Sequence, residues 1–153
     1  MEEKITHSPE ETKQLAGEVI EKLEAIEGER GTSTIIALQG NLGAGKTVFA
    51  KGVAEFLEVE DVVTSPTFVI EKVYKLKEGK PWKHLIHIDA YRLEGEEELG
   101  SIGWNDTATD PNNLIVMEWP EQVGLGVPER AVWIEIETID ENTRKYILPN
   151  IIT

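Results

Sequence analysis

The apolar residues in the first third of the chain recur at helical spacing in two segments. Residues 9 to 27 carry such a pattern, and the preceding Ser8-Pro9-Glu10-Glu11 predicts an N-terminal capping box with proline in the first helical turn. The spacing returns from residue 48 to residue 57, before a charged turn. We therefore expect two amphipathic helices.

Most other apolar residues form short runs that predict strands. A continuous run over 34–38 ends at Gly40, and another over 114–117 ends at Glu118, which is typical of buried strands. We further expect a hairpin of strands at 68–76 and 82–89, a last strand pair at 132–139 and 144–148, a short acidic helix over 94–102 and a loop over 105–113. This order predicts an α/β fold with a mixed sheet that includes antiparallel strands.

Composition narrows the class of protein. The chain has 153 residues, of which 40% are hydrophobic, and this suits a single domain over residues 1–153. It contains no cysteine and no stretch near the roughly 20 apolar residues that span a bilayer, so we expect a soluble, cytoplasmic protein without disulfides. The net charge of −14 repels a phosphate backbone, which disfavours direct binding of nucleic acid.

The segment Gly40-Asn41-Leu42-Gly43-Ala44-Gly45-Lys46-Thr47 lies between a predicted buried strand and a predicted helix. Glycines allow backbone N–H groups to approach phosphate oxygens, and the helix N-terminus adds favourable partial charge. Lys46 would neutralise the β and γ phosphates, and Thr47 would place its hydroxyl on Mg²⁺. The pattern predicts a three-layer fold like that of P-loop NTPases, with ATP and Mg²⁺ as ligands.

Two carboxylates follow buried strands and are candidates for metal or water binding. Asp89 ends the apolar run 85–88, and Glu118 ends the run 114–117, so both are expected at the carboxyl edge of the sheet. Periodicity does not decide which of them contacts the metal. His87 is interpreted as a packed histidine, whereas Trp119 suits either the core or an exposed contact with a partner.

Four motifs occur in an order that resembles the TsaE family, also called YjeE. They are the phosphate loop, Ser65-Pro66-Thr67-Phe68, His87-Ile88-Asp89-Ala90-Tyr91-Arg92 and Glu118-Trp119-Pro120-Glu121. The resemblance covers nearly the whole chain. It implies the ATPase component of the bacterial machinery that makes threonylcarbamoyladenosine in tRNA, working with TsaB and TsaD while the transfer chemistry belongs to TsaD. The acidic surface agrees with tRNA being held by those partners.

The resemblance also assigns roles to residues. It implies that the phosphates are bound by Gly43, Ala44, Gly45, Lys46, Thr47 and Val48. Thr47 and Glu118 would contact Mg²⁺, and Asp89 would support the metal or the water, which makes Lys46, Asp89 and Glu118 the catalytic group. Ser65 and Thr67 would form a switch-like loop, while Thr12 and Arg144 are expected near the nucleotide. Asn41 stands where the family usually has aspartate, and we expect little effect on binding.

Two other functions remain open from the phosphate loop alone. A small-molecule kinase would need an acceptor pocket and usually a basic lid, and the isolated Arg92 and Arg130 do not form an arginine-rich lid. An ATP-dependent protein-binding module would use the nucleotide only as a structural ligand. ATP is expected over GTP because the Asn-Lys-x-Asp pattern that reads guanine is absent.

Overall fold

The computed structural model describes residues 1–26, 31–41, 43–60 and 71–152. Within these residues seven strands form one sheet in the order β1-β7-β6-β2-β5-β4-β3. The central strands β6, β2, β5 and β4 run parallel, whereas β1, β7 and β3 pair antiparallel at the two sides. The bounds are β1 Glu2–Thr6, β2 Thr34–Gly40, β3 Glu71–Lys75, β4 His84–Asp89, β5 Asn113–Glu118, β6 Val132–Thr138 and β7 Arg144–Leu148. The predicted mixed sheet is confirmed.

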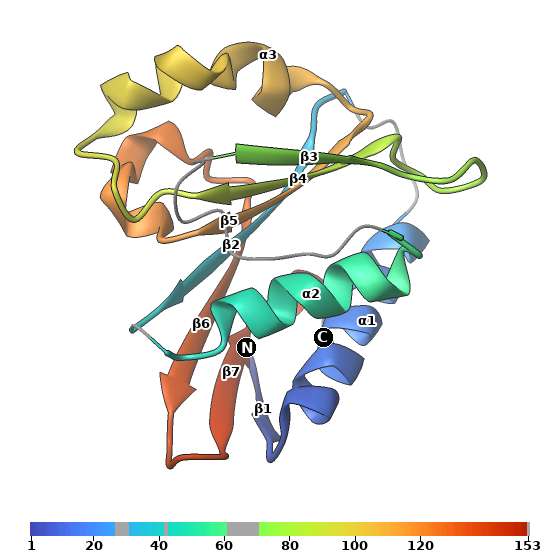
Figure 1. The fold of residues 1–153 in the computed structure, drawn as a ribbon, viewed down its shortest axis with the longest axis vertical. Coiled ribbons are helices and arrows are strands. Elements are labelled where there is room, and N and C mark those ends of the chain that lie inside the picture. Colours follow the sequence, from blue (N-terminus) through green and yellow to red (C-terminus); the bar gives the residue numbers. More distant parts are fainter. Residues whose placement is uncertain (27–30, 42, 61–70, 153) are drawn as a thin grey trace.

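Helical segments cover both faces of this sheet, which gives three layers (Figure 1). α1 (Pro9–Ala25) and α2 (Lys46–Phe56) lie on one face, and the 3₁₀ segment η1 (Glu96–Ile102) and α3 (Trp104–Thr109) lie on the other. All six residues of β5 are buried as a result. A strand that is covered on both faces reads as a continuous apolar run, which explains the pattern in the sequence.

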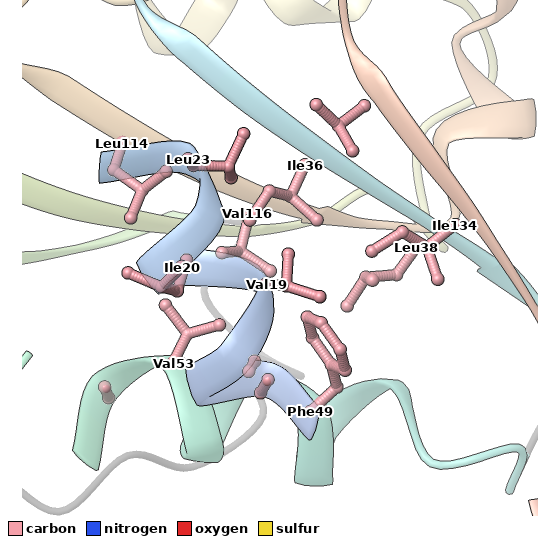
Figure 2. Close-up of a cluster of buried hydrophobic side chains, with 14 of the residues drawn as sticks. Val19, Ile20, Leu23, Ile36, Leu38, Phe49, Val53, Leu114, Val116 and Ile134 are labelled. Atoms are coloured by element: carbon pink, nitrogen blue, oxygen red, sulfur yellow. The ribbon is translucent and has the colours of Figure 1, made fainter. Parts of the chain in front are cut away.

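The two faces have separate apolar cores because side chains alternate along each strand. Figure 2 shows the core under α1 and α2. It contains Val19, Ile20, Leu23, Ile36, Leu38, Phe49, Val53, Leu114, Val116 and Ile134. The intervening strand residues, including Ile35 and Met117, pack with Leu99 and Trp104 on the opposite face.

Ser8 caps α1 as predicted, whereas the reciprocal bond of the capping box comes from the residue before the cap. The Ser8 hydroxyl accepts a hydrogen bond from the backbone N–H of Glu11 at 3.1 Å, and the Glu11 carboxylate accepts one from the N–H of His7, also at 3.1 Å. The helix ends at Ala25, two residues before the predicted end. No helix in the described part of the chain is both long and apolar enough to cross a membrane.

One local prediction was wrong, and one strand was not predicted. The expected loop over 105–113 contains α3, because Trp104 and Ala108 lie one helical turn apart and are both buried, which outweighs the weak helix propensity of Asp and Thr between them. The strand β1 was missed, since its sequence Glu-Glu-Lys-Ile-Thr is polar and it pairs at the edge of the sheet. The short acidic helix expected over 94–102 is the 3₁₀ segment η1. The motif at residues 65–68 lies outside the described residues.

Candidate functional site

The loop between β2 and α2 depends on glycine at two positions. Gly43 and Gly45 have φ values of 78° and 105°, in a region that residues with a Cβ rarely adopt. A Cβ at Gly45 would also lie 3.2 Å from the Tyr146 hydroxyl. Gly45 is the N-cap residue of α2, and no side chain there accepts a hydrogen bond from the N–H groups of the first turn. The first N–H groups of the helix have no acceptor within the helix, and such groups bind anions readily.

A pocket of about 350 Å³ opens beside this helix N-terminus. Its walls combine the glycine-rich loop with residues that follow β4 and β5. They are residues 43–48, Asp89, Tyr91, Arg92, Glu118 and Trp119. Residues 43–48 and both carboxylates proposed from the sequence therefore line one pocket, at the carboxyl edge of the parallel strands.

The side chain of Lys46 lies in this pocket and is only 5% exposed. Its ammonium group donates hydrogen bonds to the backbone oxygens of Gly40 and Asn41, the latter at 3.1 Å, and lies 3.5 Å from the ring centroid of Trp119. Burial lowers the pKa of Lys46, although the carboxylates of Glu118, Glu121 and Asp89 act in the opposite direction. A partly desolvated cation of this kind interacts strongly with an incoming anion.

Glu118 is the last residue of β5, is 3% exposed, and contacts α2. The Thr47 hydroxyl donates a hydrogen bond to its Oε1 at 3.1 Å and lies 3.4 Å from its Oε2. A hydroxyl and a carboxylate side by side supply oxygen ligands of the type that a hard divalent cation prefers. The donor set is therefore suited to Mg²⁺.

Asp89 is the last residue of β4 and lies opposite Glu118 in the parallel register of β4 and β5. Its Oδ1 accepts a hydrogen bond from the backbone N–H of Tyr91 at 3.0 Å, which turns the chain sharply after the strand. Asp89 is half-buried and forms part of the pocket wall. The register thus places both strand-end carboxylates beside each other.

Aromatic residues form a wall of the pocket that sequence patterns did not predict. The rings of Tyr91 and Trp119 lie 4.9 Å apart between centroids, and Trp119 has a left-handed backbone with φ of 61°. This conformation is uncommon for a large side chain and turns the chain away from β5 directly after Glu118. Trp119 also packs against the core beneath α3, so it serves both the core and the pocket.

Strand β7 supports the phosphate loop from the side. The Arg144 guanidinium donates a hydrogen bond to the backbone oxygen of Gly43 at 3.2 Å, which places it at the loop. Thr12 is buried, and its hydroxyl pairs with that of Thr6 at 2.8 Å and accepts a hydrogen bond from Tyr146 at 3.2 Å. Ser65 and Thr67 lie outside the described residues.

His87 is buried, as predicted, but it is more than a packing residue. Its Nε2 lies 2.5 Å from Oε2 of Glu118. The signal in the sequence is its position two residues before Asp89, which puts both side chains on one face of β4.

Comparisons with known proteins agree on one family. A family model described as Threonylcarbamoyl adenosine biosynthesis protein TsaE matches residues 6–146. A protein from Aquifex aeolicus, described as tRNA threonylcarbamoyladenosine biosynthesis protein TsaE, is 35% identical over 147 residues, which cover 95% of this chain and 93% of the relative. A Bacillus subtilis protein of the same description is 36% identical over 141 residues, which cover 92% of this chain and 80% of the relative.

A solved structure supports the same fold. The crystal structure of Bacillus subtilis YdiB superposes with a TM-score of 0.67 and 26% sequence identity. The match covers 95% of this chain and 82% of the YdiB chain. The likeness therefore extends over the whole mixed sheet and is not confined to the phosphate loop.

Proposed function

The chain belongs to the TsaE family, and from this premise we propose that it is the ATP-hydrolysing subunit of the complex that makes N6-threonylcarbamoyladenosine in tRNA. The family membership supports a role in tRNA threonylcarbamoyladenosine biosynthesis, because the relatives from Aquifex aeolicus and Bacillus subtilis are both described in those terms. The hydrolytic activity is inferred from the pocket itself.

The proposed roles follow from the position of each group. Backbone N–H groups of residues 43–48 bind the phosphates, and Lys46 neutralises their charge. Thr47 and Glu118 hold Mg²⁺, which would offset the charge on the phosphate oxygens when bound. Asp89, at the neighbouring strand end, orients the metal ligands or the attacking water.

The observation that carries this proposal is the contact between Thr47 and Glu118. The two residues are far apart in the sequence, yet Oγ1 and Oε1 are 3.1 Å apart beside the N-terminus of α2. A chance glycine turn before a helix would have no reason to face a buried carboxylate from another strand. The pair therefore favours Glu118, and not Asp89, as the carboxylate that joins Thr47 at the metal.

We further propose TsaB-like and TsaD-like proteins as partners, in the cytoplasm. The net charge of −14 opposes direct contact with tRNA, so the partners would hold the tRNA while this subunit docks on protein. ATP hydrolysis would then sustain repeated rounds of modification, and we expect it to be slow without the partners.

The test measures ATP hydrolysis by the wild type, Lys46→Ala and Glu118→Ala, each alone and with a TsaB and TsaD pair. It is run alongside tRNA threonylcarbamoylation over many turnovers. We expect hydrolysis chiefly in the complex and no sustained modification with either variant. Lys51→Ala is the matched control, because Lys51 lies on the same helix and does not line the pocket.

Two results would contradict the proposal. Sustained modification with the variants would leave an ATP-dependent binding module as the better function. A wild type that hydrolyses ATP no faster with the pair, but transfers phosphate to a small acceptor, would favour a kinase.

A further inference from the structure

The buried imidazole of His87 lies directly against the carboxylate proposed to bind Mg²⁺. His87 is 1% exposed, and its Nε2 is 2.5 Å from Oε2 of Glu118. In the parallel register of β4 and β5 it lies opposite Val116, two residues before Glu118. Side chains two residues apart on a strand share a face, so the ring is a diagonal neighbour of the carboxylate on the side covered by α2.

The two oxygens of Glu118 therefore have different neighbours. The Thr47 hydroxyl donates to Oε1 at 3.1 Å, which is closer than its 3.4 Å distance to Oε2. Oε2 instead lies 2.5 Å from Nε2 of His87. Contacts at both oxygens fix the rotation of the carboxylate plane as well as its position. A carboxylate held in this way loses little conformational freedom when a metal ion arrives.

The orientation of the imidazole toward Glu118 leaves the other ring nitrogen without a hydrogen bond in the part of the chain that the structure describes. Nδ1 of His87 is buried and has no hydrogen-bond partner among the described residues. Buried polar atoms in protein cores are usually paired, so a histidine that served packing alone would be expected to satisfy both nitrogens. The contact of Nε2 with Oε2 of Glu118 is therefore the polar contact that orients the ring.

We propose that His87 is a positioning residue that holds Glu118 in the orientation required to bind the Mg²⁺ of the bound nucleotide. The inference rests on the proposed function, because it assumes that Glu118 is a metal ligand. It assigns His87 no contact with nucleotide or metal. Hydrogen-bond partners of metal ligands typically contribute about 10-fold to 100-fold to metal affinity.

The experiment compares His87→Leu with His87→Gln in the full-length chain. Glutamine can place an amide N–H near the position of Nε2, whereas leucine removes the donor and fills similar space. Binding of a non-hydrolysable ATP analogue is measured by calorimetry at increasing Mg²⁺ concentration and in EDTA. We expect His87→Leu to raise the half-saturating Mg²⁺ concentration about 10-fold and His87→Gln less than about 3-fold, with the affinity in EDTA unchanged for both.

His84→Leu is the matched control, since His84 starts the same strand three residues earlier and does not line the pocket. We expect it to leave the Mg²⁺ requirement unchanged. If His87→Leu does not fold, His87→Asn replaces it, because asparagine is polar but too short to reach Glu118 from this position. Thermal unfolding of each variant identifies those that fold.

Glu118→Gln separates a failure of this inference from a failure of the proposed function. If Glu118→Gln leaves the Mg²⁺ requirement unchanged, the proposed metal role fails and the inference fails with it. If Glu118→Gln raises the requirement and His87→Leu does not, the inference alone is overturned. The double variant should show no further increase over Glu118→Gln, and a multiplicative increase would show that His87 acts independently of Glu118.

Discussion

The two ends of strand β5 use buried polar side chains in different ways. At the amino end the Asn113 amide donates to the backbone oxygen of Thr107 at 3.0 Å, and nearby the Ser33 hydroxyl donates to that of Ala108 at 2.6 Å. At the carboxyl end Glu118 contacts side chains, those of Thr47 and His87. Side chains that bond to backbone oxygens hold neighbouring elements together and stabilise the fold. A cluster of polar side chains at the carboxyl end of a strand is instead typical of a ligand-binding site.

This contrast predicts that changes at the amino end reduce stability and changes at the carboxyl end reduce activity. Asn113→Asp is expected to have the largest effect. It puts a buried carboxylate against the oxygen of Thr107, where the amide donated a hydrogen bond, and an uncompensated buried charge costs about 3 kcal/mol or more. Urea unfolding should show this loss of free energy, while the nucleotide affinity of the folded fraction stays at the wild-type value.

The contrast would fail if Asn113→Asp weakened nucleotide binding by the folded protein. Asn113→Ala is a milder companion. It removes the donor without adding charge, and we expect a loss of about 2 kcal/mol.

Glu118→Gln is expected to have the second largest effect. It should change ATP hydrolysis, whereas Asn113→Asp should change stability. The amide keeps the shape of the side chain but weakens metal binding, so hydrolysis by the complex should fall about 100-fold, equivalent to about 2.7 kcal/mol. The free energy of unfolding should stay within about 1 kcal/mol of wild type, because a neutral group replaces a buried charge. Glu135→Gln, at an exposed strand position, is the control.

Tyr146→Phe sharpens the comparison, because Tyr146 lies beside the phosphate loop yet bonds to a structural group. Loss of its hydrogen bond to Thr12 should cost about 1 kcal/mol at neutral pH. Burial raises the pKa of Tyr146 above its usual value of 10.0. Above that pH the unfolded chain releases the proton while the folded chain retains it, so stability falls as pH rises toward the folded pKa.

Denaturant titrations of wild type and Tyr146→Phe between pH 8 and pH 11 test this pH dependence, since the variant lacks the buried phenol. We expect the difference in stability between the two proteins to shrink as the pH rises above about 10. A constant difference would mean that the phenol titrates alike in both states.

The carboxyl edge of the sheet was largely predictable from the sequence, and the amino edge was not. Loop glycines and strand-end carboxylates are recognisable residue types at recognisable positions, so residues 43–47, Asp89 and Glu118 could be named in advance, and the family resemblance added Val48. The bonds made by Asn113 and Ser33 go to backbone oxygens of α3, and a backbone acceptor leaves no mark on the sequence. The helix α3 was itself missed, because a single apolar pair, Trp104 and Ala108, is too short a pattern to stand out among Asn, Asp and Thr.

The contact of His87 with Glu118 depends on strand pairing, which the pattern of residues along the chain does not show. Periodicity placed His87 on a buried strand, but its neighbour is set by the pairing of β4 with β5 and by their register. A shift of one residue would turn Glu118 toward the opposite core. The sequence therefore indicated the residues of the site better than the contacts among them.

Ser8→Ala is expected to have the smallest effect and measures what a purely local signal contributes. It removes the hydroxyl that accepts from Glu11 N–H and should cost about 1 kcal/mol of unfolding free energy, a typical value for an N-cap. Ser8→Asp retains an acceptor and should keep most of the stability. Because Ser8 does not line the pocket and bonds only within the first turn of α1 among the contacts described for it, Ser8→Ala should leave ATP hydrolysis by the complex unchanged. A fall in hydrolysis comparable to that of Glu118→Gln would show that the first turn of α1 belongs functionally to the carboxyl edge.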